Sequence, residues 1–361
     1  MPEQHRFWDR QPVGIGNSNE PIEPPKSVPS NPIELPSGFS FDTLCPAKEL
    51  ISLHKLLSEH YVEHPKSEFR LFYSVEFLKW QLNAPGVRPE YAVTVKYAGE
   101  IVGFTLAREH TVQHKGVIRR VVSVNFLCLT RNLRKRRLAP VIIREVTRRA
   151  NKNGIFQAIF TGGIKLPFSF STSQYFHFPI DGPELVKLGY MRQYHSQRKL
   201  NAIRPGTRTM EERDIDRVME LYKKSATKYS LYEIYNKEEF KYNFLTRPGV
   251  INTYVHEENG VITEFGSFYH LNSLIIGKNI KEIPTAYLYI YSTDNHINFI
   301  EELIALSSKE GCILFNCLDI MQNKRFIKDL NFLPGDGFLN YYFFNCNAEI
   351  MDSSDIGFIL V

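Results

Sequence analysis

The sequence lacks the features that mark disulfide-rich, metal-bound or membrane-spanning proteins. Its five cysteines are scattered over 361 residues and form no Cys-x-x-Cys pair, which disfavours a disulfide framework or a zinc ribbon and favours a reducing cytoplasm. No apolar run reaches the ~18 residues that cross a bilayer, and the N-terminus lacks the basic-then-apolar layout of a signal peptide. We therefore expect a cytoplasmic protein without a transmembrane segment and without a metal.

Tryptophan is scarce, with only Trp8 and Trp80, whereas Phe and Tyr are abundant at 26 and 19 residues. That balance favours strands and large apolar pockets over a helical bundle. The chain is 43% hydrophobic and 23% charged, so a fibrous or disordered protein is excluded. At ~100–200 residues per domain, its length predicts two domains.

The net charge of +5 is modest, but its distribution along the chain is uneven. Between Arg131 and Lys152 only Glu145 opposes a run of basic residues, which predicts an anionic partner. These basic residues are Arg131, Arg134, Lys135, Arg136, Arg137, Arg144, Arg148, Arg149 and Lys152.

The order of predicted elements repeats along the chain. Residues 1–40 are rich in Pro, Asn and Ser and predict an extended arm, and a helix follows over 46–60. Each half then shows three strands, a helix and a strand, which predicts two similar α/β domains with mixed sheets, covering 1–204 and 205–361. The first set lies at 91–96, 101–107, 121–129, 138–151 and 155–160, and the second at 250–256, 261–269, 286–291, 299–308 and 312–318, before a short helix at 324–330 and a strand at 339–345.

The basic run lies where a strand turns into a helix. Free N–H groups and the positive dipole end of a helix bind phosphate there. The spacing Arg134-x-x-Arg137-x-Ala139 resembles the pyrophosphate loop of GNAT acyltransferases, R/Q-x-x-G-x-G/A, with Arg137 in place of the central glycine. A solvated basic helix face, a nuclear-import signal or an RNA-binding run are the alternatives.

Further segments carry a resemblance to a family. They are Phe7–Val13, Asn125–Cys128, Ala139–Ile142, Glu145–Arg149, Gly154–Ala158, Leu166-Pro167, Tyr175–His177 and Gly335–Tyr342. In these segments, in order from Phe7 to its end, the chain resembles glycylpeptide N-tetradecanoyltransferase (N-myristoyltransferase). The resemblance implies a tandem, pseudo-symmetric GNAT-like fold whose first half holds the co-substrate myristoyl-CoA and whose second half supplies most of a peptide groove.

The resemblance also implies catalytic roles. The backbone N–H groups of Phe126 and Leu127 would form the oxyanion hole, and Asn125 and Thr161 would help to hold the substrate amine. The base would be the C-terminal carboxylate, on Val361, whose apolar surroundings Gly357–Leu360 suit burial. The acyl-CoA would contact Phe7, Trp8, Phe126, Leu127, Cys128, Leu129, Arg134, Lys135, Arg136, Arg137, Leu138, Ala139 and Pro140.

The implied partners are peptides and nascent proteins that begin with glycine, bound by a monomer that takes no nucleic acid as substrate. The acidic run that usually follows Tyr61-Val62-Glu63 is mostly missing here, which predicts weaker preference for basic residues late in the substrate. The short arm before Phe7 leaves a ribosome contact weakly supported. The groove would be lined by Tyr61, Val62, Phe69, Tyr73, Thr161, Tyr175, His177, Tyr287, Asp336 and Gly337.

Two other functions share some of these features. A GNAT-type N-acetyltransferase would share the phosphate loop but not a long acyl pocket. A non-enzymatic basic module for RNA or acidic membranes would use the Arg131 to Lys152 face and would leave the aromatic arm and the apolar tail unexplained.

Overall fold

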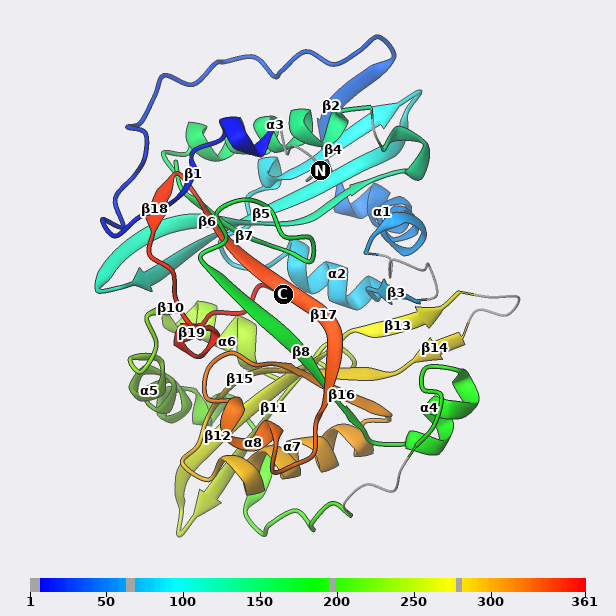
Figure 1. The fold of residues 1–361 in the computed structure, drawn as a ribbon, viewed down its shortest axis with the longest axis vertical. Helices are drawn as coiled ribbons and strands as arrows, with labels where there is room; N and C mark the ends of the chain where they lie inside the picture. The colour runs from blue at the N-terminus through cyan, green and yellow to red at the C-terminus, as the bar shows by residue number, and fades with distance from the viewer. Residues whose placement is uncertain (1–6, 63–68, 135, 195–198, 277–280) are drawn as a thin grey trace.

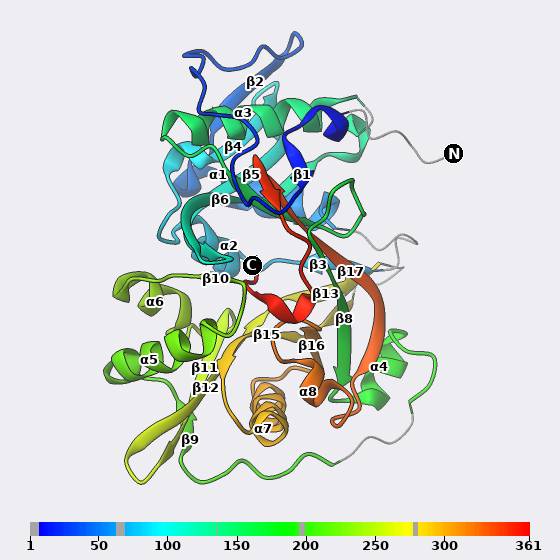
Figure 2. The ribbon, with the colours of Figure 1, turned by 60° about the vertical axis from the view of Figure 1, so that its left-hand side comes forward.

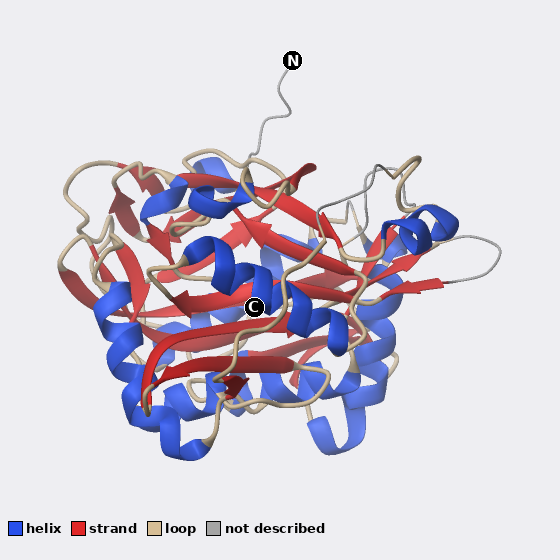
Figure 3. Cartoon of the chain, turned by 90° about the horizontal axis from the view of Figure 1, so that it is seen from below, coloured by secondary structure: helices blue, strands red, loops and turns tan. Residues whose placement is uncertain are grey.

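The computed structural model describes residues 7–62, 69–134, 136–194, 199–276 and 281–361. Its centre is a fourteen-stranded mixed sheet with helices on both sides (Figures 1 and 3). The order along the main path is β19-β10-β5-β6-β7-β17-β8-β16-β15-β12-β11-β9, with β4 and β2 attached to β5. The helices are α1 (Pro46–His60), α2 (Val75–Leu82), α3 (Leu138–Lys152), α4 (Gly182–Leu188), α5 (Ile215–Ala226), α6 (Lys237–Phe244), α7 (His296–Lys309) and α8 (Lys324–Ile327).

The strands of the large sheet come from both halves of the chain. Those of the first half are β2 (Phe39–Thr43), β4 (Ala92–Tyr97), β5 (Glu100–His114), β6 (Val117–Leu129), β7 (Ala158–Gly162) and β8 (Ser171–Pro179). Those of the second half are β9 (Thr207–Thr209), β10 (Leu231–Glu233), β11 (Ile251–Glu258), β12 (Val261–His270), β15 (Thr285–Ser292), β16 (Leu314–Leu318), β17 (Leu333–Phe344) and β19 (Ile356–Gly357). Two small sheets use β1 (Val13–Ile15) with β18 (Cys346–Ala348), and β3 (Phe69–Phe72) with β13 (Asn272–Ile275) and β14 (Lys281–Ile283).

The same pairing pattern occurs twice. In the first half β4, β5 and β6 are antiparallel neighbours, and β7 lies parallel to β6 after the crossover helix α3. In the second half β11, β12 and β15 are antiparallel, and β16 lies parallel to β15 after α7. The predicted tandem GNAT-like α/β fold is therefore confirmed.

The two halves exchange their next strands. β17, from the second half, pairs with β7 of the first, and β8, from the first half, pairs with β16 of the second. β8 and β17 also pair with each other, and they cross the centre of the molecule side by side (Figures 1 and 2). The exchange fuses the two cores, because one apolar cluster contains Phe77 and Phe104 together with Phe268 and Phe315.

The arm lies over the first half. After a single helical turn at Trp8–Arg10, β1 pairs with β18 near the other end of the chain. Further on, Arg148 donates hydrogen bonds from Nη1 to the carbonyl oxygens of Pro29 and Ser30, at 3.1 and 3.2 Å. The arm is thus packed onto α3. Among the described residues, no helix is long and apolar enough to cross a membrane.

Candidate active site

A β-bulge interrupts the centre of the first half. In the β5–β6 ladder Phe104 faces Cys128 and Leu106 faces Asn125, so Thr105 alone faces both Phe126 and Leu127. Phe126 has φ +56°, in the left-handed region that non-glycine residues rarely occupy. A bulge of this kind takes residues out of the ladder and redirects their backbone groups. The Thr105 hydroxyl donates to the Asn125 carbonyl oxygen at 3.1 Å and ties the bulge to β5.

The side chain of Phe126 belongs to the core. It is 2% exposed, and its ring centroid lies 5.2 Å from that of Tyr73 and 5.9 Å from that of Tyr61. Because the side chain is fixed by packing, the bulge is held in place from the core side. The neighbouring strands also part here: β6 and β7 pair only at Val122–Ala158 and Ser123–Ile159. Asn125 and Thr161 each follow that contact by two residues, where the strands separate.

The C-terminal tail reaches the bulge from the other half. β19 pairs with β10, and Gly357 is pressed against Tyr229, since an added Cβ would lie 2.4 Å from that ring. Phe358 is 2% exposed, and the residues after it are partly buried. Asn125 donates from Nδ2 to a Val361 oxygen at 3.2 Å. The terminal residue therefore lies beside the asparagine that opens the bulge.

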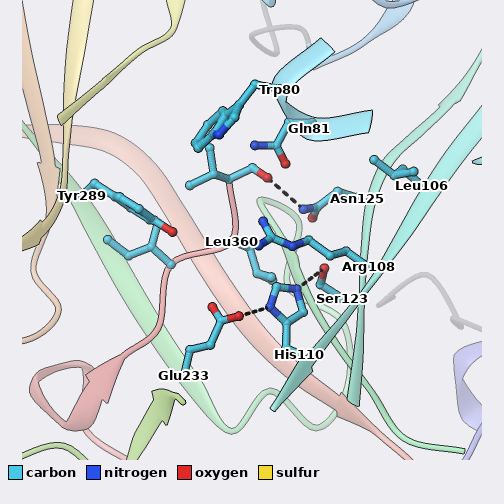
Figure 4. Close-up of a pocket in the computed structure, with 12 residues that line it drawn as sticks. Trp80, Gln81, Leu106, Arg108, His110, Ser123, Asn125, Glu233, Tyr289 and Leu360 are labelled. Carbon is cyan, nitrogen blue, oxygen red and sulfur yellow. Dashed lines mark hydrogen bonds and ion pairs between the residues drawn. The ribbon is translucent and has the colours of Figure 1, made fainter. Parts of the chain in front are cut away.

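A pocket surrounds this contact (Figure 4). Strands β5 and β6, helix α2, strands β10 and β15 and the tail all contribute to its wall. The Arg108 guanidinium projects toward the middle of the group of side chains, and His110 bridges Ser123 and Glu233 at the lower side of the view (Figure 4). The lining residues are Trp80, Gln81, Leu106, Arg108, His110, Ser123, Asn125, Glu233, Tyr289, Ile359, Leu360 and Val361.

The basic turn presents an uncapped helix N-terminus. Arg137 is the N-cap of α3 in the left-handed conformation, with φ +60°, and its side chain makes no capping hydrogen bond. The first turn carries no acidic residue, and Pro140 within it lacks an N–H that the helix does not need. The dipole end is thus positive and open to an anion. Arg136 and Arg137 are exposed, Leu138 is buried, Ala139 and Pro140 are half-buried, and Lys135 lies outside the described residues.

Not all of the basic run is available to a partner. Arg148 and Arg149 both donate hydrogen bonds to the fully buried carboxylate of Glu145, at 2.7 to 2.8 Å. Burial would raise the pKa of Glu145, but these hydrogen bonds outweigh it and hold that pKa below its usual value. Arg134 is also engaged, since its guanidinium donates to backbone oxygens of Leu129 and His60. The predicted anionic partner is thus left with a smaller basic surface, at the turn itself.

The aromatic residues of the arm cover the end of β7. Trp8 stacks on Phe160 with centroids 5.0 Å apart, and Phe160 stacks on Tyr342 at the same distance. The Arg144 guanidinium lies 6.0 Å from the Phe7 ring centroid. The two arm residues predicted for acyl-CoA binding thus lie against the first half. Trp8 packs on β7, and Phe7 lies beside Arg144 of α3. Cys128 and Leu129 are buried at the end of β6, and Leu127 is half-buried.

The predicted groove residues form a cluster of tyrosines around the crossing strands. Tyr61 and Tyr73 have centroids 5.7 Å apart, and Tyr175 lies 6.3 Å from Tyr287. Burial raises the pKa of each, for Tyr287 to about 12, so their hydroxyls stay neutral hydrogen-bonding groups at physiological pH. Tyr269, which sequence reasoning missed, stacks on Tyr287 at 5.3 Å.

His177 is the predicted groove residue with a titratable imidazole ring. Its Nδ1 lies 2.7 Å from Asn316 Oδ1, and burial lowers its pKa, so the ring is neutral near pH 7. Gly335 is required there because an added Cβ would lie 2.2 Å from His177 Nε2. Tyr190 packs edge-on against both His177 and the predicted Phe69, with centroids 6.4 and 5.3 Å away.

The remaining predicted residues border the groove. Asp336 and Gly337 are exposed on β17, and the charge of Asp336 acts on the His177 ring. Thr161 is half-buried on β7 opposite Tyr341, and Val62 is exposed. The acidity-poor segment 63–68 lies outside the described residues. Within the described ranges, no three His, Cys, Asp or Glu side chains are grouped as a metal site.

Sequence reasoning missed several residues that the fold brings to the site. Tyr341 donates to the Phe358 carbonyl oxygen at 3.5 Å, and Arg108, His110 and Glu233 line the pocket of the tail. The alternation of apolar and polar residues in β5 could have placed Arg108 and His110 on one face. Nothing in the local pattern around Glu233 signals its partner, 123 residues away.

Comparisons with known proteins agree over the whole chain. Residues 19–173 match the family model of the myristoyl-CoA:protein N-myristoyltransferase N-terminal domain, and residues 186–357 match that of the C-terminal domain. Glycylpeptide N-tetradecanoyltransferase 2 of Danio rerio is 36% identical over 99% of this chain and 77% of its own length. The Candida albicans glycylpeptide N-tetradecanoyltransferase is 35% identical over 96% of this chain and 86% of its own. The crystal structure of Saccharomyces cerevisiae N-myristoyltransferase with bound myristoyl-CoA superposes with a TM-score of 0.94 at 31% identity, covering 99% of this chain and all of that one.

Proposed function

The chain belongs to the myristoyl-CoA:protein N-myristoyltransferase family, and from this premise we propose that it moves a tetradecanoyl group from myristoyl-CoA to the N-terminal glycine amine of proteins, with Val361 as base. It is an acyltransferase, a glycylpeptide N-tetradecanoyltransferase with myristoyl-CoA as co-substrate. The observation that carries the finer mechanism is the meeting of the Phe126 bulge, Asn125 and the Val361 terminus at one point.

The first step of this mechanism is removal of a proton from the substrate amine by the base. The α-amine of a peptide has a reference pKa of ~7.7–8.0, so a large share of it arrives protonated at neutral pH. The Val361 carboxylate takes that proton, and the partial burial of the tail favours a base stronger than an exposed terminus. Asn125 supports this role, because its amide donates to a Val361 oxygen and orients the group.

The acyl transfer itself needs no covalent enzyme intermediate. The amine nitrogen attacks the thioester carbonyl carbon, a C–N bond forms and the C–S bond breaks. The nitrogen gives up a second proton as it becomes an amide, and CoA leaves as the thiol after its sulfur takes up that proton. Negative charge develops on the carbonyl oxygen in between. The N–H groups of Phe126 and Leu127 stabilise this charge, and each fixed donor of this kind lowers the activation free energy by ~2.7–4 kcal/mol. The left-handed bulge supports the proposal because it turns backbone groups out of the β5–β6 ladder.

The remaining residues are proposed to bind the two substrates. The uncapped start of α3, with Arg136 and Arg137, would receive the CoA phosphates, and Phe7 and Trp8 would cover them. The tyrosine cluster and His177 would line the peptide groove. Asp336 would meet a basic side chain of the peptide, since it is exposed beside that groove. Residues 1–204 and 205–361 are proposed as the two halves, with the exchanged strands joining them.

The setting of the reaction is also proposed. All five cysteines are free, and four are buried, which favours a reducing compartment such as the cytoplasm. We also propose that the protein acts as a monomer on nascent proteins that begin with glycine.

A transfer assay tests the function. Labelled tetradecanoyl-CoA is incubated with an octapeptide that begins with glycine and with the same peptide beginning with alanine. We expect label only on the glycine peptide. Label on neither peptide, or transfer from acetyl-CoA in preference to tetradecanoyl-CoA, would contradict the proposal.

A further inference from the structure

A buried polar chain lies directly behind the C-terminal tail. His110 Nδ1 is 2.6 Å from Glu233 Oε1, and His110 Nε2 is 2.9 Å from Ser123 Oγ. The three residues are 8%, 7% and 2% exposed. They come from β5, β10 and β6, and they line the same pocket as Val361 (Figure 4).

The order Ser–His–Glu is that of a nucleophile, a base and an orienting acid. Here, however, Ser123 is buried within β6, so no acyl donor can reach its hydroxyl. The three hydrogen-bonded side chains therefore have a role other than nucleophilic catalysis. Its histidine is saturated by one partner on each ring nitrogen, which fixes the orientation of the imidazole.

The fixed imidazole supports the tail. The rings of His110 and Phe358 pack edge to face, with centroids 5.4 Å apart and planes at 89°. Phe358 is three residues before Val361 and is almost fully buried. A displaced His110 would open space directly beneath the last buried anchor of the tail.

The partner of His110 is attached to the tail as well. Glu233 belongs to β10, which pairs with β19 at Leu231–Ile356 and Tyr232–Gly357 on one edge. On its other edge β10 pairs with β5, the strand that carries His110. The His110–Glu233 contact therefore fastens β5 to β10, the strand along which β19 and the tail are aligned.

Loss of the His110–Glu233 hydrogen bond destabilises the buried carboxylate of Glu233. Burial would raise the pKa of Glu233, but the charge and hydrogen bond of His110 and the charge of Arg108 hold that pKa below its usual value. Without the imidazole the buried carboxylate loses a charge-assisted hydrogen bond, which drives β10 to shift toward water or another donor.

We propose that His110 is a positioning residue: bridged between Ser123 and Glu233, it holds Phe358 and thereby fixes the C-terminal carboxylate at the active site. Its effect on turnover rests on the proposed role of Val361 as base. Its effect on the tail does not.

Two measurements on His110→Ala separate these claims. The first is the rate at which carboxypeptidase A releases valine and leucine from the folded protein, which reports whether the tail stays docked. The second is kcat with a glycine-start octapeptide, beside KM for myristoyl-CoA. We expect about tenfold faster release, about 10- to 100-fold lower kcat and a KM for myristoyl-CoA within about twofold of wild type, because a small displacement of a catalytic group has effects of that size.

His114→Ala is the matched control. His114 lies four residues along the same strand, is also buried, and packs on Phe343 and Phe170. It should lose stability without faster release and without the fall in kcat. His110→Asn should recover only part of kcat, because its Nδ2 amide keeps a donor for Glu233 near the position of the imidazole Nδ1 but the ring that packs on Phe358 is lost.

The outcomes are distinct. Unchanged release from His110→Ala, or equal release from His114→Ala, overturns the positioning role. Faster release with unchanged kcat supports the positioning of the tail but contradicts Val361 as base. If His110→Ala does not fold, Ser123→Ala removes one of the two bridges, and release no faster than wild type then overturns the proposal.

Discussion

The two halves carry the same bulge at the same place but use it differently. In the second half Gly266 faces Tyr291 and Phe268 faces Leu288, so Ser267 alone faces Tyr289 and Ile290. There the Ser267 hydroxyl donates to the Ile290 carbonyl oxygen at 2.9 Å and accepts from its N–H at 3.3 Å. The second bulge thus satisfies its own backbone, whereas in the first half Thr105 bonds only the carbonyl oxygen of Asn125.

The turns after the two bulges differ as well. In the first half the left-handed Arg137 begins a helix with basic neighbours. In the second, Thr293 and Asp294 precede α7, and the Thr293 hydroxyl is bound to Glu264. Both helices start without a side-chain cap, but the arginines stand only before α3, whereas the acidic Asp294 precedes α7. The second half is proposed to contribute its tail to the site instead.

The largest expected effect comes from removing that contribution. Deletion of Val361 moves the terminal carboxylate back to Leu360, away from its contact with Asn125, while the bulge and the basic turn stay intact. Loss of a general base lowers kcat by about 10²–10⁴-fold. We expect this fall in single-turnover rates, with the Kd of myristoyl-CoA within about twofold. A truncated protein that keeps a tenth of its turnover contradicts the role.

The hydroxyls opposite the bulges give the next contrast. Ser267→Ala leaves the Ile290 N–H buried without its partner and should cost about 1–3 kcal/mol in urea unfolding, with kcat unchanged. Thr105→Val loses the tie to Asn125 and should lower kcat about tenfold through a displaced bulge. The reverse assignment of the two effects would mean that the second bulge is the active one.

Each crossover helix also holds a buried acid, Glu145 in α3 and Glu302 in α7. We expect the loss of Glu145 to lower the free energy of unfolding more than the loss of Glu302. Glu145→Ala leaves two guanidinium groups without their carboxylate and should cost about 3–5 kcal/mol. The Glu302 partner Arg204 is 28% exposed, and water can replace part of its bonds, so Glu302→Ala should cost less.

The pH dependence follows from the lowered pKa of Glu145. The folded pKa lies below the usual 4.5, so its stabilisation is present above pH ~4.5 and is lost as pH falls through the folded pKa. Urea unfolding of wild type should weaken over that acid range, and the slope should be shallower in Glu145→Ala. Equal slopes would contradict the assignment.

The smallest effect is expected at the basic turn. Arg137→Gly relieves a left-handed residue and should stabilise the fold by about 1 kcal/mol. It also removes one charge from the proposed phosphate site, so the KM for myristoyl-CoA should rise, and the rise should shrink at high salt. Asn153→Gly, at the other end of α3, is the control that leaves that KM unchanged.

The sequence predicts some of the helices closely and misses others. Helix α1 has the predicted bounds because its leucines repeat at helical spacing, and α3 extends one residue past the prediction. α2 and α6 were not predicted, since eight residues give little periodicity. α5 was also missed, although its buried residues Ile215, Val218, Leu221 and Tyr222 follow helical spacing.

The exchange of β8 and β17 could not be predicted, because pairing between strands ~160 residues apart leaves no local pattern. The same holds for the bridge from His110 to Glu233. The number of basic residues between Arg131 and Lys152 overstates the charge available to an anionic partner, because Arg148 and Arg149 form ion pairs with the buried Glu145. Side-chain composition shows charge but not which charges are already paired.

The difference between the two bulges can be measured at the backbone itself. An ester in place of the amide at Leu127, introduced as the α-hydroxy acid, removes one proposed oxyanion donor and leaves the side chain unchanged; the same change at Ile290 removes the N–H that Ser267 already binds. We predict that the Leu127 ester lowers kcat by about 10²–10³-fold while the Ile290 ester loses only stability. A Leu127 ester that turns over like wild type, or equal losses at the two sites, would contradict the account.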